Sequence, residues 1–258
     1  MDLFHEYLRW LLALLIGCSF GSFFANLIQL QLIERPIEPS IIGYRLRSRC
    51  DHCRRTLNWF ENVPILAWFI LRGHCRSCRQ PINPLYPVVE ILSVCVAMIS
   101  INIHAQPVEA FLIYLLGMVL LHICWIDSRH LMISDTALTW LLVVTCALLL
   151  TEGSPVSVST GLQGALTGFL LLEVCRVAFL SVRGYSGLGA ADPKLMLCLG
   201  LLMHPEHVLH AISLAGILAL VYWLFEACRA DSVELRRAIP FAPFLVAGAL
   251  GVHGIRLL

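Results

Sequence analysis

The sequence predicts an all-α integral membrane protein with about eight transmembrane helices and a small zinc-ribbon-like loop. Hydrophobic residues make up 59% of the 258 residues and charged residues only 14%, whereas about 25% of a soluble domain is charged. The mean hydropathy is +0.80. Apolar runs long enough to cross a bilayer recur along the chain, and one polar stretch, 32–85, separates the first two runs.

Each predicted span is a run of mostly apolar residues, since about 20 of them are needed to cross the hydrocarbon core as a helix. The first run follows the acidic start MDLFHEYLRW, which lacks the basic residues of a secretory signal peptide, so we expect a retained helix. The sixth run is the shortest. The candidate spans are 9–31, 86–104, 108–126, 135–150, 160–181, 193–204, 207–228 and 239–255.

Between the predicted spans, basic residues occur only in alternate loops, and this predicts the orientation of the chain. Basic residues lie in the long loop 32–85 and in the loops after the third, fifth and seventh spans. The loops around 104–108, 151–160 and 203–207 carry none. By the positive-inside rule the basic loops face the cytosol and both termini lie outside. A net charge of +1, divided among separate loops, gives no indication of nucleic-acid binding.

The long loop holds four cysteines in two CxxC pairs. Pairs at this separation are a metal-binding pattern, and four thiolates suit tetrahedral zinc. Thiols stay reduced in the cytosol, so disulfides are not expected. A complete set of four ligands leaves no open position, so we predict a structural metal, with His52 or His74 as a substitute for one ligand. The predicted ligands are Cys50, Cys53, Cys75 and Cys78.

Two aspartates lie at the predicted cytosolic ends of spans. Asp127 ends the third span in CWIDSRH, and Asp192 begins the sixth in GLGAADPKL. Carboxylates at membrane depth are costly and indicate function. Two that meet can share a proton, because neighbouring like charges do not both ionise readily. One can then activate water as a general base while the other polarises a scissile carbonyl as an acid, which is aspartic-protease chemistry and needs no metal.

Structural roles for these aspartates stay open at this point. Asp127 could pair with Arg129 or cap the following helix. Asp192 before Pro193 is an ordinary helix start, with Asp at the cap and Pro at the first helical position. Asp135 is a third acidic candidate, which we interpret as the cap of the fourth span.

Residues close to Asp192 favour a functional interpretation. Gly187 and Gly189 precede it and would let a substrate strand approach the backbone. Lys194 follows it and could support the ionised carboxylate or extend to the lipid interface.

These motifs resemble those of the type IV prepilin peptidases, membrane aspartic proteases of the GxGD type. Residues 48–92, SRCDHCRRTLNWFENVPILAWFILRGHCRSCRQPINPLYPVVEIL, are similar to the family's cysteine-containing block almost throughout. WIDSRHLMISD resembles its first aspartate motif, GLGAADPKL resembles GxGxGDxKL, and IPFAPFLVAG resembles IPFGPxLxxG. The similarity covers most of the chain, from about Gly21 to Gly248.

The resemblance implies that Asp127 and Asp192 are the catalytic pair of a peptidase of the bacterial inner membrane. Such enzymes cleave the basic leader from prepilins or pilin-like secretion subunits on the cytosolic side. Many then methylate the new N-terminus with S-adenosylmethionine, an activity linked to the cysteine loop. The chain then divides into a first helix (1–31), a cysteine loop with structural Zn²⁺ (32–85) and a peptidase core (86–258).

The chain departs from the family motifs at several positions. Ala191 replaces the glycine before the second aspartate, at a cost of about 1 kcal/mol if a positive φ is needed there. Ala242 replaces the glycine of IPFGP and Ser134 the proline of the first motif. Ala25 stands where the family has asparagine, and Asn26 follows one residue late. Because that region is associated with methylation, cleavage is expected more strongly than methylation.

Two other functions remain as alternatives. An ion-coupled transporter would use carboxylates near the bilayer midplane on broken helices, whereas both aspartates here lie at helix ends. A non-catalytic membrane scaffold with a zinc docking loop would account for the GAAD sequence at the second motif.

Overall fold

The computed structural model describes residues 2–32, 48–104, 106–185, 187–229 and 238–257. The chain forms two compact units, residues 1–105 and 106–258. Part of the predicted basic loop, 33–47, and the basic residues within 230–237 lie outside the described residues. The prediction of membrane orientation that rests on them stays a prediction.

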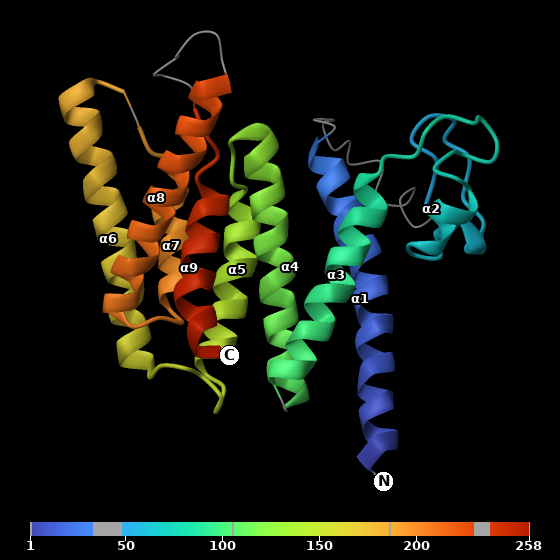
Figure 1. Ribbon diagram of the computed structural model, residues 1–258, viewed down its shortest axis with the longest axis horizontal. Coiled ribbons are helices and arrows are strands. Elements are labelled where there is room, and N and C mark those ends of the chain that lie inside the picture. Colours follow the sequence, from blue (N-terminus) through green and yellow to red (C-terminus); the bar gives the residue numbers. More distant parts are fainter. Residues whose placement is uncertain (1, 33–47, 105, 186, 230–237, 258) are drawn as a thin grey trace. The chain divides into compact units, whose positions relative to one another are not determined.

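The first unit consists of two long helices and the cysteine loop that joins them (Figure 1). Helix α1 spans Asp2–Leu32 and α3 spans Leu85–Ile103. The loop contains a 3₁₀ turn, η2, at Trp59–Asn62 and a short helix, α2, at Leu66–Ile70. Helix α3 therefore belongs to the same compact unit as α1, whereas the domain boundaries expected from the sequence assigned it to the core 86–258.

Small residues let α1 and α3 approach closely. A Cβ at Gly21 would lie 2.8 Å from the Cβ of Ser93, and one at Gly17 would lie 2.8 Å from the Cα of Val94. The Ser93 hydroxyl, fully buried, donates to the Gly17 carbonyl at 2.7 Å. Lipid supplies no hydrophobic force between helices, so close backbone packing and buried hydrogen bonds of this kind hold them together.

The second unit is a helical bundle in which a short helix is enclosed by longer ones (Figure 1). A glycine on each of α6 and α7 brings their backbones together, since a Cβ at Gly200 would lie 2.6 Å from the Gly164 carbonyl oxygen. The six helices are α4 (Pro107–His130), α5 (Asp135–Leu149), α6 (Val158–Arg183), α7 (Asp192–Gly200), α8 (Pro205–Arg229) and α9 (Ala242–Leu257).

A helix lies at each of the eight predicted spans, but their lengths differ. Among the described residues, five helices are long and apolar enough to cross a membrane: α1, α3, α4, α6 and α8. Helices α5 and α9 have 15 and 16 residues. Helix α7, at the predicted span 193–204, has nine. At about 1.5 Å per residue it covers roughly half of the hydrocarbon core, so it cannot cross alone.

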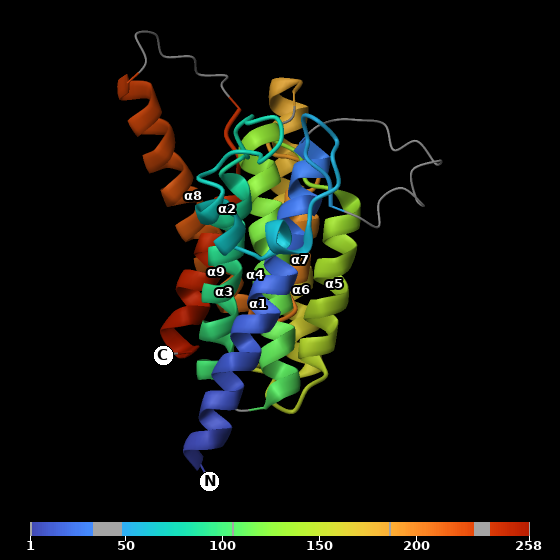
Figure 2. The ribbon, with the colours of Figure 1, turned by 90° about the vertical axis from the view of Figure 1, so that its right-hand side faces the viewer.

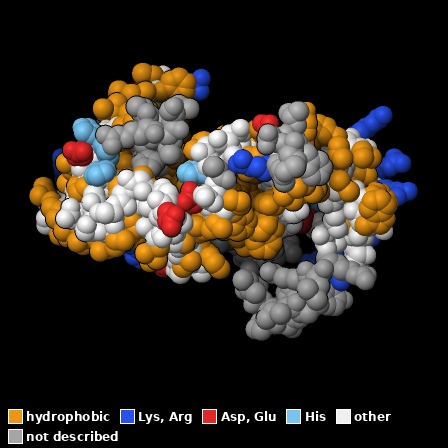
Figure 3. Space-filling view, turned by 90° about the horizontal axis from the view of Figure 1, so that it is seen from below, with side chains coloured by type: hydrophobic (Ala, Val, Ile, Leu, Met, Phe, Trp, Pro, Cys, Tyr) orange, Lys and Arg blue, Asp and Glu red, His pale blue; other side chains and the backbone are white. Residues whose placement is uncertain are grey.

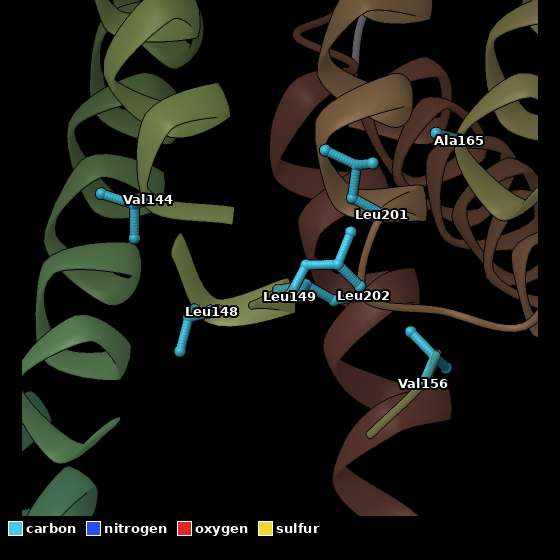
Figure 4. Packing of buried hydrophobic residues seen from close by; sticks show 7 residues of the cluster. All are labelled: Val144, Leu148, Leu149, Val156, Ala165, Leu201 and Leu202. Atoms are coloured by element: carbon cyan, nitrogen blue, oxygen red, sulfur yellow. The ribbon is translucent and has the colours of Figure 1, made fainter. Parts of the chain in front are cut away.

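Buried aliphatic side chains fix the end of α7 that is remote from Asp192. They come from the end of α5, the start of α6 and the turn after α7, and Figure 4 shows them gathered around that turn. The cluster therefore packs the C-terminal end of the short helix against α5 and α6. Its members are Val144, Leu148, Leu149, Val156, Ala165, Leu201 and Leu202.

Apolar side chains also cover the outside of the long helices. Leu166, Leu170 and Val174 on α6 are more than half exposed. The space-filling view from below faces the ends of the helices, where hydrophobic side chains lie among other and charged ones (Figure 3). A bundle that is apolar inside and outside is suited to a lipid environment.

Candidate active site and metal centre

Asp127 is buried near the C-terminal end of α4, where it meets the start of α9. The helix ends at His130, and the cap residue Leu131 has a left-handed backbone and donates its N–H to the Asp127 carbonyl at 2.9 Å. The Asp127 side chain is 6% exposed, and its Oδ2 accepts the N–H of Ala242 at 2.9 Å. The backbone N–H of Phe241 also hydrogen-bonds this carboxylate.

Asp192 is the first residue of α7 and is 5% exposed. Its Oδ2 accepts the N–H of Gly189 at 2.9 Å. The carboxylate thus turns back to the glycine loop that precedes it, while Pro193 occupies the first helical turn. Pro at this position fits the helix start, because the N–H it lacks would have no partner within the helix.

The fold brings the two aspartates together from distant parts of the sequence. Asp127 lies near the end of α4 and Asp192 at the start of α7, and their carboxylates lie within the range of direct electrostatic interaction. Both are buried, so water does not screen that interaction strongly. Two such carboxylates hold a proton between them more readily than they both ionise. The pair can therefore supply one acid and one base at the same place.

The glycine loop before Asp192 is packed tightly. A Cβ at Gly189 would lie 2.9 Å from the Asp192 Oδ2, and one at Gly187 would lie 2.7 Å from the Phe179 ring. Side chains at either position would push on the carboxylate or on α6. Ala191, in contrast, has φ −88° and ψ −21°, an ordinary right-handed backbone. Alanine therefore causes no backbone strain here, because position 191 does not require a positive φ.

Lys194 and Asp135 form an ion pair between α7 and α5. The Lys194 Nζ lies 2.9 Å from the Asp135 Oδ1, and both side chains are exposed. Lys194 therefore contacts Asp135, and the structure records no contact from it to Asp192 among the described residues. The prediction that Asp135 caps the fourth span is wrong by one residue, since Ser134 holds the cap position and Asp135 begins α5.

The four cysteines of the loop converge on one point. Their sulfur atoms all lie within 4.8 Å of one another, and the Cys50 and Cys78 sulfurs are 3.8 Å apart. Tetrahedral zinc with Zn–S bonds of about 2.3 Å requires ligand sulfurs roughly 3.8 Å apart, so the donor set fits the ion. Neither His52 nor His74 belongs to the cluster, and the His74 Nδ1 contacts the Arg72 carbonyl oxygen at 2.7 Å.

The two CxxC pairs form knuckles with the same backbone design. In each, the first cysteine donates its N–H to the carbonyl five residues later, from Cys50 to Arg55 and from Cys75 to Gln80. In each, the arginine after the second cysteine has a left-handed backbone, with φ 56° and 54°. Backbone N–H groups, that of Cys78 foremost, lower the pKa of the Cys75 thiol to about 6, which favours the thiolate that binds metal.

A cavity of about 240 Å³ lies between the cysteine loop and the helices of the first unit. Its walls include Asn26 of α1 and the buried Glu90 of α3. Ala25, at the position where the family resemblance expects asparagine, is fully buried. Asn26, one residue later, lines the cavity, and its amide nitrogen donates to the Ser22 carbonyl at 3.0 Å. Both signs of charge line it, with Arg49 and Arg76 as well as Glu90.

Sequence reasoning missed two residues at these sites. It noted Ala242 only as a replaced glycine and did not foresee its N–H on Asp127. Glu90 lies in the motif stretch 48–92, but its partner, the N–H of Ile65 at 2.6 Å, was not predicted. The IPFAPF motif could have drawn attention to Ala242. A backbone N–H donor, however, cannot be recognised from the identity of the side chain.

Family models match both units of the chain. Residues 15–104 match the bacterial peptidase A24 N-terminal domain, and residues 114–224 match the type IV leader peptidase family. No solved structure matches the chain.

Curated relatives carry one name almost throughout, "Prepilin leader peptidase/N-methyltransferase". The protein from Burkholderia pseudomallei is 31% identical over 202 residues, which cover 78% of this chain and 65% of the relative. The one from Aeromonas hydrophila is 31% identical over 203 residues, covering 78% and 69%. The one from Vibrio cholerae is 24% identical over 229 residues, covering 87% and 90%. The chain thus spans just under two thirds of the Burkholderia relative.

Zinc content tests the metal centre directly. Cys75→Ser should reduce bound zinc from about one ion per chain to almost none, since a tetrahedral thiolate site needs all four ligands. The measurement is elemental analysis of the purified protein, with limited proteolysis of the loop alongside. Cys175→Ser, an exposed cysteine of α6, is the matched control and should keep the metal. Equal zinc in both variants would contradict the assignment.

Proposed function

This chain belongs to the type IV leader peptidase family, and from that premise we propose that it is a membrane aspartic endopeptidase of the bacterial inner membrane. Its substrates would be type IV prepilins or pilin-like secretion subunits, from which it removes the basic leader. The observation that carries the proposal is the meeting of Asp127 and Asp192, both buried and each held by a backbone N–H. The names of the relatives support the substrate class.

The two aspartates have different surroundings, and we assign their roles from this difference. Asp127 accepts hydrogen bonds from two backbone N–H groups at the start of α9, which favour its ionised form. Asp192 accepts one, from Gly189. Asp127 is therefore the general base and Asp192 the proton donor.

Hydrolysis then follows with the protons in balance. Asp127 takes a proton from water as the hydroxyl oxygen bonds to the scissile carbonyl carbon, and Asp192 gives its proton to the carbonyl oxygen. In the second step the C–N bond breaks. Asp127 passes its proton to the departing amine, and Asp192 recovers one from the hydroxyl of the new carboxylic acid. Both side chains end as they began.

The cut would fall on the cytosolic side of the membrane. Support comes from the alternation of basic and neutral loops, which places the start of α7 and the end of α4 on the same side as the cysteine loop. A basic leader held in the cytosol by its own charge would meet the pair there.

The cysteine loop would hold structural Zn²⁺, and the cavity beneath it is our candidate site for S-adenosylmethionine. Cysteine sulfur spacing supports the first assignment. The second is supported by a cavity wall of mixed charge that includes Glu90, Tyr86 and Trp68. A carboxylate and aromatic rings suit a cationic methyl donor that carries a heteroaromatic base. The donor would supply the methyl group for the amine that cleavage exposes.

Particular residues argue against the scaffold and transporter alternatives. The scaffold hypothesis rested on Ala191, whose ordinary backbone gives no reason for an impaired site. The transporter hypothesis needs an ion site at mid-membrane on a broken helix. Both aspartates instead lie at helix ends, with backbone donors on their oxygens.

Exchange of each aspartate for asparagine tests the pair. Asp127→Asn and Asp192→Asn should each slow processing of a co-expressed prepilin by about 10²–10⁴-fold, because an amide neither takes nor gives the proton. Asp135→Asn is the matched control and should process normally, since its carboxylate serves an exposed ion pair. Mass analysis of the product N-terminus reports methylation in the same sample. Normal processing by either of the first two variants would contradict the mechanism.

Loss of the Ala242 N–H tests the role given to Asp127. Ala242→Pro removes that donor at the first position of α9, where proline is tolerated. A hydrogen bond to a charged group contributes about 1.5–3 kcal/mol, so the acidic limb of the pH–rate profile should move about 1–2 units upward as Asp127 becomes protonated more easily. Ala242→Val adds bulk but keeps the N–H, so the acidic limb of its pH–rate profile should not move. An equal shift in both variants would mean that packing, not the donor, matters.

Restoring the motif glycine should bring little gain. Ala191 has no strain to relieve, so Ala191→Gly should leave the cleavage rate nearly unchanged. It should lower stability by about 0.4–1 kcal/mol, because glycine raises the entropy of the unfolded chain. Single-turnover cleavage and thermal unfolding in detergent measure the two effects. A large rise in cleavage rate would show that alanine impairs the site.

A further inference from the structure

The short helix α2 of the cysteine loop exposes a group of large apolar side chains. Phe69 is 58% exposed and Ile70 is 73% exposed, and Leu66 beside them is also more than half exposed. Trp59, in the neighbouring turn η2, is 82% exposed. A loop surrounded by water would bury such residues or lack them, because each exposed one forfeits about 1.5–3 kcal/mol of burial.

The start of α2 is fixed at a definite depth along α3. The Glu90 carboxylate accepts the N–H of Ile65, the residue that precedes α2, at 2.6 Å. Glu90 lies five residues after Leu85, where the membrane-capable helix α3 begins. At about 1.5 Å per residue this is roughly 7 Å inside the span.

Contacts with helix α1 give a consistent depth. The Asn83 amide donates to Gln29 at 2.9 Å and so marks the level at which α3 begins. Ser22, which hydrogen-bonds Glu90 and lines the cavity together with Ile65, lies seven residues deeper than Gln29. That offset is roughly 10 Å from the level of Asn83, which precedes Leu85 by two residues, and so roughly 7 Å from the start of α3. Both ribbon views accordingly show α2 beside the first turns of α3 rather than beyond its end (Figures 1 and 2).

The backbone at this point is held in an unfavourable conformation. Ile65 has φ 63° and ψ −58°, the strained γ-turn conformation that a β-branched residue rarely adopts, and the Leu66 N–H donates to the Pro64 carbonyl across it at 2.6 Å. Strain of this kind persists only where surrounding contacts impose it. The Glu90 hydrogen bond is such a contact, and it aims the chain so that α2 starts within the depth of the span.

Basic residues follow α2 directly. Arg72 and Arg76 are exposed, and the Arg76 guanidinium lies 5.6 Å from the centre of the Phe60 ring. Arginines next to an apolar segment can reach lipid phosphates while the apolar side chains enter the acyl boundary. This combination of depth, apolar surface and positive charge selects an anionic lipid surface as the occupant.

We propose that α2 is an interfacial segment that inserts Leu66, Phe69 and Ile70 into the headgroup–acyl boundary of the bilayer and so docks the cysteine loop on the membrane. Glu90 sets the depth of the insertion through its bond to Ile65. The proposal concerns the first unit alone and does not depend on peptidase activity.

Photo-crosslinking in vesicles tests this docking. The full chain, reconstituted in phosphatidylcholine with phosphatidylglycerol, carries a benzophenone side chain at position 69 or, as the matched control, at the exposed Ser77 of the same loop. Irradiation should give mainly lipid adducts at position 69 and few at position 77, as measured by mass spectrometry. Absence of lipid adducts at position 69, or adducts to a second protein chain there, would overturn the proposal.

A second variant tests the role of Glu90. Glu90→Ala in the chain labelled at position 69 removes the acceptor for Ile65 and should lower the yield of lipid adduct, whereas Glu90→Gln keeps an acceptor oxygen and should preserve it. Bound zinc, measured in parallel, shows that the loop is still folded. Undiminished adducts in a zinc-bound Glu90→Ala protein would show that Glu90 does not set the depth.

Discussion

A carboxylate buried among membrane helices must find in the protein the solvation that it loses with water, and the second unit is arranged around that requirement. An ion without partners in such surroundings is costly by many kcal/mol. Asp127 lies at a helix end whose own carbonyls offer it no donors. The first N–H of α9 supplies one, so the position of α9 against α4 is fixed by a polar contact as well as by packing. Asp192 obtains its donor from the loop that precedes it.

Close helix contacts make these polar contacts geometrically possible. Lipid competes equally well for apolar side chains, so helices in a bilayer gain little from burying leucine against leucine. Glycines at Gly164 and Gly200 instead let α6 and α7 touch along their backbones. The short α7 is thereby held in place although it makes no complete crossing. Its first residue, Asp192, is thus positioned by backbone geometry rather than by a large apolar surface.

Features with a strong one-dimensional pattern could be predicted from the sequence. Apolar runs gave the helix positions, and the CxxC spacing gave a cluster whose four sulfurs meet. The assignment of Asp127 and Asp192 depended on motif resemblance, since nothing in hydropathy relates positions so far apart. The catalytic roles themselves stay a prediction.

Other features could not be predicted, for physical reasons. The short length of α7 could not be predicted, because an apolar turn such as Leu201–Met203 has the same hydropathy as a helix. The N–H groups that Ala242 and Ile65 donate could not be predicted, because every residue except proline has a backbone N–H. Asp135 was misplaced by one residue, which is the ordinary uncertainty of a helix boundary.

The two cysteine knuckles have a consequence for the segment that lies between them. Each knuckle is closed by its own backbone hydrogen bonds, so an ion bound to both would act as a cross-link between Cys50 and Cys75. Closing a loop lowers the entropy of the unfolded chain by an amount that grows with loop length. The strained turn at Ile65 lies inside this loop. The free energy of ion binding can therefore offset that strain. The conformation of the turn at Ile65 would then depend on whether a metal ion is bound.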